Sequence, residues 1–371
     1  DNIQRSPLYG GMIEGVGPRY CPSIEDKVVR FAGKERHPIF VEPCGENTEE
    51  MYLQGASSSL PEDVQNAFYR SIKGFEHIEI MRPAYAIEYD CVDPTSLEAT
   101  LESKVVRGLY GAGQFNGTSG YEEAAAQGLL AGLNAARNAL GKEQLILPRH
   151  TSYLGTLVDD LVTKGVMDPY RMMTSRSEYR LILRQDNADL RLTEKGHSIG
   201  LVGEERYARF LERKKKYEEA MDYIRTQRFT PKEEINRALE SMGTAPLTTG
   251  TGADQILKRP EMTYRKMMET LGCPSFDEEA VEEMEITVKY EGYIARQEAA
   301  VRKAARMENE KLPPDMDYLS LDGISTEARQ KMDKIRPLSL GQAARIPGVS
   351  PADISVLMVY VKQRKGKKSA E

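Results

Sequence analysis

The chain has 371 residues, of which 29% are charged and 40% hydrophobic, a composition typical of a globular protein with two or three domains. It contains neither an apolar run long enough to span a bilayer nor a secretory signal pattern. The formal net charge of −6 excludes a general electrostatic attraction to nucleic acid, so such binding would need local basic patches.

Cysteine and histidine are too scattered in this sequence to predict a metal centre. The cysteines form neither a CxxC pair nor a disulfide framework, which favours a reducing compartment. The 4 histidines show no clustered spacing of the kind that zinc requires. We therefore expect no metal site.

The first informative segment is 17–27, GPRYCPSIEDK. Pro22 suits the first position of a helix, and acidic residues follow it, so we expect a helix that begins at Pro22 with Cys21 at its cap. A thiol at that helix end, with Arg19 two residues away, ionises more readily than a free cysteine, which is the property of a nucleophile. The alternative is a cysteine that merely precedes a helix, and the local sequence favours the two equally.

The following residues have a mixed pattern with β character. Residues 39–42 and 51–54 read as short strands on either side of a polar turn, and 84–89 reads as a third strand. Between them, 61–71 reads as a helix.

A strand, a glycine-rich loop and a helix are expected next, at 105–110, 111–120 and 122–140. Backbone N–H groups at a helix N-terminus bind phosphate, and glycines permit close approach. The loop lacks the GxGxxG spacing because position 116 is Asn, so it suits a second contact to a large cofactor that is held elsewhere. The alternative is a tight turn without a ligand.

The segment 168–184 concentrates arginine and tyrosine. Arg176, Arg180 and Arg184 are four residues apart, so a helix would place them on one face, where they could contact RNA phosphates and unstacked bases. The alternative, which composition alone favours, is an arginine network that bonds Asp186, Asp189 and Glu194 and holds two domains together.

The remainder of the chain is predicted to be helical. We expect a linker at 243–252, which is rich in Gly and Thr, and helices at 204–225, 278–309, 325–334, 339–345 and 351–363. The segment 346–350 is similar to the turn of a helix-hairpin-helix, whereas the apolar run 354–361 is more simply a core or partner face.

Long motifs give the chain a family resemblance. In order they are GPRYCPSIEDK, GQFNGTSGYEEAAAQGLLAGLNAA, DPYRMMTSRSEYRLILRQDNADLRLT, KYEGYIARQ and GQAARIPGVSPADI. With these motifs the chain resembles the carboxy-terminal part of the MnmG (GidA) family of flavoproteins. The resemblance implies FAD, reduction by NADH and a GTPase partner, MnmE. It implies that an aminomethyl or carboxymethylaminomethyl group is installed on carbon 5 of the wobble uridine of certain tRNAs, with a carbon from methylenetetrahydrofolate. It also implies a homodimer, a heterotetramer with MnmE and a cytoplasmic location.

The resemblance also implies roles for individual residues. Cys21 matches a catalytic cysteine that is thought to add to the uracil ring. The stretch linked with NAD supplies Gly17, Pro18, Arg19, Tyr20, Ser23, Glu25, Asp26, Lys27 and Phe31, and the loop linked with FAD supplies Gly113, Gln114, Thr118 and Gly120. Arg171, Arg176 and Arg180 match a segment implicated in tRNA binding, and the carboxy-terminal helices match the docking site of the GTPase.

The expected fold class is α/β, a partial FAD-binding Rossmann-like domain with an inserted β-rich domain, followed by an all-α carboxy-terminal region. We expect the domains 1–145 (partial FAD/NAD-binding with an inserted substrate domain), 146–255 (helical linker and tRNA binding) and 256–371 (partner docking). The family's FAD fingerprint and its second cysteine are absent from the chain, so we expect the chain alone to be inactive. The alternatives are a non-catalytic GTPase- and tRNA-binding module or a relative of the folate-dependent tRNA uridine methyltransferase; the long helical region argues against the latter.

Overall fold

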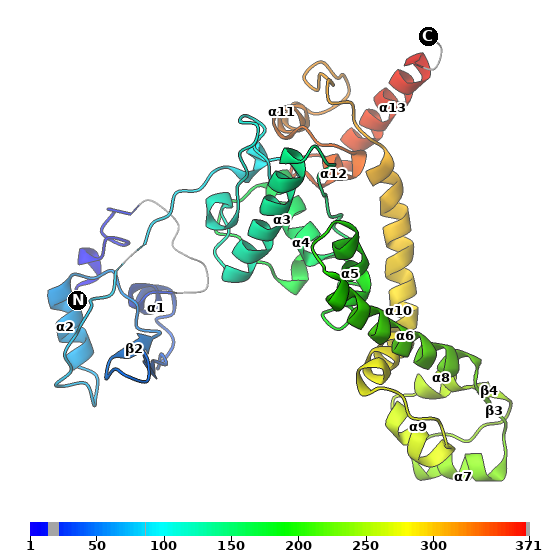
Figure 1. Ribbon diagram of the computed structural model, residues 1–371. Helices are drawn as coiled ribbons and strands as arrows, with labels where there is room; N and C mark the ends of the chain where they lie inside the picture. The colour runs from blue at the N-terminus through cyan, green and yellow to red at the C-terminus, as the bar shows by residue number, and fades with distance from the viewer. Residues whose placement is uncertain (14–21, 86, 369–371) are drawn as a thin grey trace. The chain divides into compact units, whose positions relative to one another are not determined.

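The computed structural model describes residues 1–13, 22–85 and 87–368, with backbone only beyond 363, and these divide into two compact units (Figure 1). Unit 1 comprises Asp1–Leu145 and Asp160–Met172, and unit 2 comprises Ile146–Asp159 and Met173–Glu371. One helix, α4 (Tyr153–Lys164), carries residues of both units. Within the described residues, no helix is both long and apolar enough to cross a membrane.

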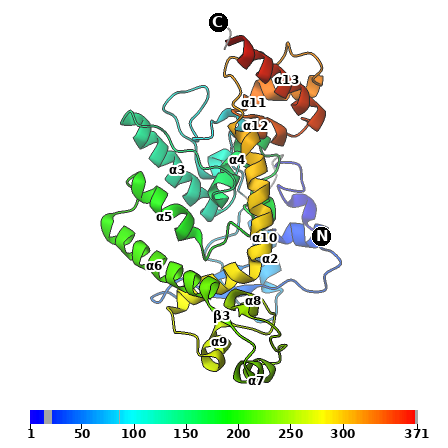
Figure 2. The ribbon, with the colours of Figure 1, turned by 90° about the vertical axis from the view of Figure 1, so that its right-hand side faces the viewer.

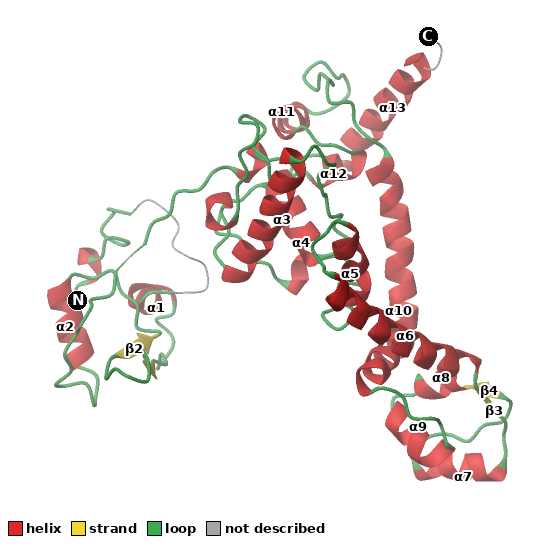
Figure 3. Ribbon diagram, in the orientation of Figure 1, coloured by secondary structure: helices red, strands yellow, loops and turns green. Residues whose placement is uncertain are grey.

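Unit 1 combines short helices with one β-hairpin, as Figure 3 shows. The hairpin is antiparallel, with Val41 opposite Leu53, which confirms the two strands expected around the polar turn. The elements of unit 1 are η1 (Ile3–Arg5), α1 (Ile24–Arg30), β1 (Phe40–Pro43), β2 (Met51–Gln54), α2 (Glu62–Arg70), η2 (Pro94–Ser96), η3 (Gly113–Asn116) and α3 (Tyr121–Ala139).

Helix α1 begins later than we expected. Ser23 is its N-cap, and the Ser23 hydroxyl accepts a hydrogen bond from the backbone N–H of Asp26 at 3.2 Å. A serine hydroxyl at the N-cap accepts a hydrogen bond from an otherwise unpaired N–H of the first turn. A proline at the N-cap could not do this, because its side chain has no acceptor. The expectation that Cys21 caps this helix is therefore wrong, and Cys21 itself lies outside the described residues.

Two expected strands of unit 1 are absent from the described residues. The segment 105–110 is a turn, because the backbone N–H groups of Val105 and Val106 bond the Ser103 hydroxyl and that of Gly108 bonds Glu102. Gly108 has a φ of +80°, which a strand does not permit. Of 84–89, the described residues 84, 85 and 87–89 form no strand, although the Ala84 backbone is held at both ends by Gln65.

Unit 2 is almost entirely helical (Figure 3). Its long helices confirm the predicted segments 204–225 and 278–309, and its last three confirm those predicted after residue 320. Besides the shared α4, the elements are η4 (Thr174–Arg176), α5 (Ala188–Ser198), α6 (Glu204–Thr226), β3 (Arg228–Phe229), α7 (Glu233–Ser241), β4 (Thr251–Gly252), α8 (Ala253–Leu257), α9 (Tyr264–Leu271), α10 (Glu278–Asn309), α11 (Thr326–Ile335), α12 (Leu340–Arg345) and α13 (Pro351–Lys368).

Two hydrophobic cores stabilise unit 2. The first lies between α6 and the start of α10 and is centred on fully buried side chains such as Ile224 and Tyr264. It includes Leu247, and β4 pairs with β3, so the interpretation of 243–252 as a linker is wrong and one core spans the expected boundary at residue 255. The second core is formed by α11, α12 and α13, and α10 runs from the first core to α12 in both Figure 1 and Figure 2.

Candidate functional site

The glycine loop of unit 1 is a tight turn that leads into α3. Gly113 and Gly117 have φ angles of +70° and +78°, which other residues adopt only with strain. A side chain at Gly120, the N-cap of α3, would collide with Glu123 and Arg171. Gln114 is half-buried, and Thr118 is buried. The loop places all four expected cofactor-binding residues around one helix N-terminus.

Buried polar side chains hold this loop against α3. The Gln127 side chain accepts from Asn116 Nδ2 at 2.8 Å and donates to Thr118 Oγ1 at 3.0 Å. Glu123 Oε1 accepts from the backbone N–H of Met172 at 2.6 Å. Within the described residues, Asn116 Oδ1, Ser119 Oγ and Glu123 Oε2 are buried without a hydrogen-bond partner. Buried polar atoms normally find partners, so these atoms leave hydrogen-bonding capacity unused within the loop.

The charge around the loop selects the kind of group that it could bind. Glu122 and Glu123 lie in the first turn of α3, where their carboxylates oppose the binding of a phosphate, although Arg171 lies 3.9 Å from Glu123 and offsets part of that charge. Asn116 Oδ1 accepts a hydrogen bond, whereas the Ser119 hydroxyl donates or accepts one. Both atoms are buried, and Asn116 Oδ1 lies against Gly111.

The described residues of the segment linked with NAD are bonded within unit 1. Glu25 is fully buried and accepts from the backbone N–H and hydroxyl of Ser59 at 2.7 and 2.6 Å. Burial opposes ionisation of Glu25, but the hydrogen bonds from Ser59 outweigh it and hold its pKa below the ordinary value. Asp26 accepts from Tyr9 at 3.0 Å, and Lys27 donates to the carbonyl of Gly55.

The other residues of that segment fall into two groups. Ser23 caps α1, and the Phe31 ring is 45% exposed, so of these described residues it is the one that presents a ring to a ligand. Gly17, Pro18, Arg19, Tyr20 and Cys21 lie outside the described residues. Their assignments remain predictions.

The arginines of 168–184 do not share one helix face. Arg171 belongs to unit 1 and donates to the Ser119 carbonyl at 3.2 Å, whereas Arg176 and Arg180 belong to unit 2. The helical turn at Arg176 ends there, and Arg180 lies in an exposed turn. Arg184 forms an ion pair with Asp186 at 2.9 Å and donates to Glu283 at 2.6 Å, so for Arg184 the expected alternative of an arginine network is found, within unit 2.

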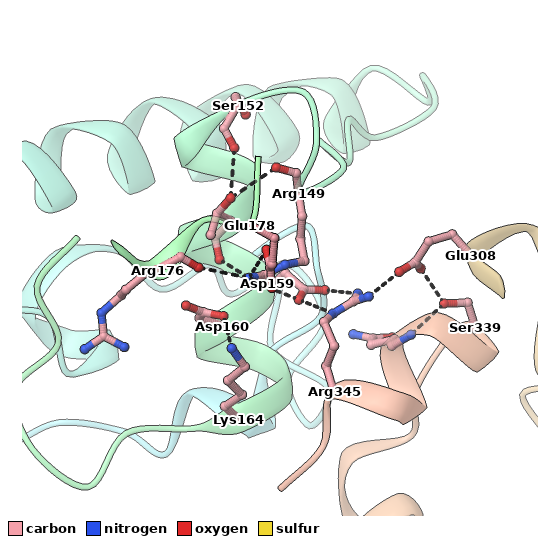
Figure 4. A network of polar contacts seen from close by, with 12 residues as sticks. Arg149, Ser152, Asp159, Asp160, Lys164, Arg176, Glu178, Glu308, Ser339 and Arg345 are labelled. Carbon is pink, nitrogen blue, oxygen red and sulfur yellow. Dashed lines mark hydrogen bonds and ion pairs between the residues drawn. The ribbon is translucent and has the colours of Figure 1, made fainter. Parts of the chain in front are cut away.

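Sequence reasoning missed the network that positions Arg176 and its neighbours (Figure 4). Arg149 is buried, and it donates to Asp159 at 3.0 Å, to both carboxylate oxygens of Glu178 at 3.1 Å and to the Arg176 carbonyl at 3.4 Å. Asp159 also accepts two hydrogen bonds from Arg345 of α12, at 2.8 and 2.7 Å.

The network continues to the end of α10. Arg345 pairs with Glu308, and Glu308 accepts from the Ser339 hydroxyl at 2.6 Å. The Arg149 network thus ties the turn that carries Arg176 to α10 and α12, as Figure 4 shows. Bonded pairs in the network lie up to 186 positions apart in sequence, so no local pattern could have revealed the pairing.

Three family models match the chain. Residues 1–143 match "Glucose inhibited division protein A". Residues 204–298 match the "tRNA modifying enzyme MnmG/GidA C-terminal helical domain", and residues 300–371 match the corresponding "C-terminal helical bundle".

Curated relatives and solved structures agree with these matches. The "tRNA uridine 5-carboxymethylaminomethyl modification enzyme MnmG" of Caldicellulosiruptor saccharolyticus is 56% identical over 98% of this chain and 58% of its own length. The protein of the same name from Clostridium botulinum strain Hall is 57% identical over the same shares. Aquifex aeolicus GidA, in its form I crystal, is 47% identical with a TM-score of 0.82 over 97% of this chain and 57% of that chain.

This structural likeness confirms the expected fold class, an α/β part followed by an all-α carboxy-terminal region. The chain spans about 58% of the length of the curated relatives it matches.

Proposed function

Because the chain belongs to the MnmG/GidA family of tRNA modifying enzymes, we propose that the whole protein modifies carbon 5 of the wobble uridine in tRNA. The group installed is an aminomethyl or carboxymethylaminomethyl group, and methylenetetrahydrofolate donates its one-carbon unit. The observation that carries the proposal is identity of 54–57% to enzymes named for this reaction over nearly the entire chain. We place the reaction in the cytoplasm, as for a tRNA substrate.

FAD, reduced by NADH, supplies the hydride chemistry when it is bound. The glycine loop supports this proposal, because its glycines let the edge of an isoalloxazine ring approach the backbone closely. Gly113, Gln114, Thr118 and Gly120 hold that edge at the start of α3. The phosphates of the cofactor need another site, because the carboxylates of Glu122 and Glu123 repel them here.

The residues from 17 to 31 contact the nicotinamide cofactor in our proposal, with Phe31 as an exposed ring for stacking. Cys21 supplies the thiolate that bonds to the uracil ring and makes carbon 5 nucleophilic. Arg171, Arg176 and Arg180 contact tRNA phosphates, and the Arg149 network fixes the backbone from which Arg176 projects. The enzyme acts as a homodimer and joins MnmE in a heterotetramer through the carboxy-terminal helices.

Nucleoside mass spectrometry tests the proposal. Cells that lack the whole protein receive the wild type, Cys21→Ser or Cys44→Ser; Cys44 is an exposed cysteine that we assign no role. We expect the wild type and Cys44→Ser to restore the modified uridine and Cys21→Ser to leave it absent. Restoration by Cys21→Ser would remove Cys21 from the chemistry, and no restoration by the wild type would overturn the proposed reaction.

A further inference from the structure

The middle of α10 carries the motif KYEGYIARQ, to which no role has yet been given. One side of this part of the helix lies against the arginine segment, because Gln297 accepts from the backbone N–H of Leu181 at 3.1 Å and donates to the Glu178 carbonyl at 3.2 Å. The opposite side is exposed over several turns. An exposed helix face in the centre of a unit is a candidate interaction surface.

Three cations lie on that exposed face. Successive residues turn by roughly 100° around a helix, and this places seven exposed residues in one stripe. The α10 stripe consists of Gly292, Tyr293, Arg296, Ala299, Ala300, Lys303 and Arg306. The nearest acidic residues, Glu291 and Glu298, are exposed beside the stripe; Glu291 pairs with Lys258 at 2.6 Å, and Glu298 pairs with Arg302 at 3.7 Å.

The three cations of the α10 stripe differ from most basic residues of unit 2. Many of the others pair with carboxylates, as Arg184, Arg213 and Lys258 do. Within the described part of the chain, no ion pair is found for Arg296, Lys303 or Arg306. On a protein with a net charge of −6, three cations without an ion pair on one helix face favour an anionic partner.

Aromatic rings lie at the start of the stripe. The Tyr293 ring is 58% exposed, and the guanidinium of Arg296 lies 5.8 Å from its centroid. Tyr290, 46% exposed, lies with its ring centroid 6.4 Å from that of Tyr293. Exposed aromatic rings beside arginine provide a stacking platform for unpaired bases. An acidic protein surface does not need such a platform, so the rings favour RNA as the partner.

Gly292 provides an independent observation. Glycine in a helix interior costs about 0.5–1 kcal/mol relative to alanine. Among the described residues, an added Cβ at Gly292 would meet nothing within 4 Å, and Gly292 is not among the glycines with positive φ, so neither packing nor backbone conformation requires glycine there. Together with Ala299 and Ala300, it leaves space for a sugar-phosphate backbone to approach the helix closely.

We propose that the α10 stripe is an RNA-binding surface, on which Arg296, Lys303 and Arg306 contact phosphates and Tyr293 stacks on an unpaired base. This inference rests on the proposed function in that the RNA is the tRNA substrate. The stripe lies on the same unit as Arg176 and Arg180, and it extends the region that contacts tRNA beyond the arginine segment. The alternative partner of the α10 stripe is an acidic protein surface.

The test measures the affinity of the whole protein for a labelled, unmodified tRNA transcript over a range of salt concentrations. The test variant replaces Arg296, Lys303 and Arg306 with alanine. The control variant makes the same change of charge elsewhere in unit 2, at Arg209, Arg237 and Arg265, whose side chains are 74–75% exposed. We expect the test variant to bind at least about tenfold more weakly and the slope of log K against log salt to fall by about two, because each lost phosphate contact removes about 0.7–0.9.

A second variant, Tyr293→Ala, separates stacking from charge. We expect it to weaken binding by roughly tenfold with little change in the salt slope, because base stacking is not an ionic contact. The inference would be overturned if the test variant had the same tRNA affinity and salt slope as the control variant. It would also be overturned if the test variant bound tRNA as the wild type does but no longer bound an acidic protein. Failure of the proposed reaction is a separate outcome: the wild type would then restore no modified uridine, whatever the stripe binds.

Discussion

At the scale of single residues, the most consequential group is a carboxylate shared by two arginines. Asp159 bonds both Arg149 and Arg345, whose side chains are 6% and 21% exposed. Removing one partner of such a cluster leaves uncompensated buried charge, which costs about 3–5 kcal/mol. Glu178 also bonds Arg149, but its side chain is 54% exposed, so water replaces it at little cost.

We therefore expect Asp159→Asn to lower the free energy of unfolding by about 3 kcal/mol and Glu178→Gln by less than about 1 kcal/mol. Urea unfolding of the two variants, followed by circular dichroism, measures the difference. Equal losses would show that the shared carboxylate has no special place in the network.

Glu283 makes stability depend on pH. Burial, helped by the neighbouring Asp186, raises its pKa from 4.5 to about 8. In the unfolded chain Glu283 ionises near 4.5, whereas the native protein keeps the proton up to about 8, so its contribution to stability is complete below 4.5 and is lost as the pH rises through 8.

We expect the unfolding free energy to fall by at most about 3 kcal/mol between about pH 6 and pH 8, and Glu283→Gln to flatten that fall. The adjacent exposed carboxylate supplies the control, Glu282→Gln, which should keep the wild-type profile. Thermal unfolding at a series of pH values measures this. A profile that Glu283→Gln leaves unchanged would assign the dependence to another group.

At the scale of elements, the long helices were predicted well, whereas strands were predicted correctly only at the hairpin. The bounds of α10 agree with the prediction, because caps and composition act locally: Asp277 caps the first turn, and prolines follow the last. The expected strand at 105–110 has β-branched residues but is a turn, because the side chains of Glu102 and Ser103 bond its backbone. Of the candidate site, the glycine loop could be located from its high glycine content ahead of a predicted helix. The Arg149 network could not, because it depends on pairings between distant residues that local patterns do not encode.

The apolar run of α13 is divided between the core and the surface. Leu357 is fully buried in the second core of unit 2, whereas Val359 is 52% exposed. If the carboxy-terminal helices receive the GTPase, as we propose, the contact must use the exposed side of α13. A polar side chain there changes binding, whereas one in the core changes folding.

We expect Val359→Asp to weaken the complex with the GTPase by roughly tenfold with an unchanged melting temperature, and Leu357→Asp to destabilise the carboxy-terminal helices by more than about 3 kcal/mol. Pull-down with the GTPase, combined with thermal unfolding of each variant, separates the two effects. Wild-type binding by the folded Val359→Asp variant would place the partner on another face.

At the scale of the whole molecule, unit 1 presents an incomplete environment for a flavin. Large apolar side chains lie exposed on the glycine loop, on α3 and just before them, among them Val105 (83%) and Tyr121 (93%). The printed sequence contains no GxGxxG, and the loop that is present opposes phosphate. The curated relative from Caldicellulosiruptor saccharolyticus extends beyond the 58% of its length that this chain matches, and we propose that a phosphate site lies in that further part.

We therefore expect the whole protein to retain FAD through purification and the 371-residue chain alone to lose it. A neutral ring edge supplies a few hydrogen bonds of about 1 kcal/mol each, whereas a pyrophosphate held at a helix N-terminus adds charge-assisted bonds that are about twice as strong. Visible absorption of both proteins, and fluorescence titration with added FAD, measure the difference. Circular dichroism must first show that the shorter chain is helical and unfolds cooperatively. Equal affinity of the two proteins would mean that the glycine loop holds the whole cofactor, so the acidic first turn of α3 would have to tolerate a phosphate after all.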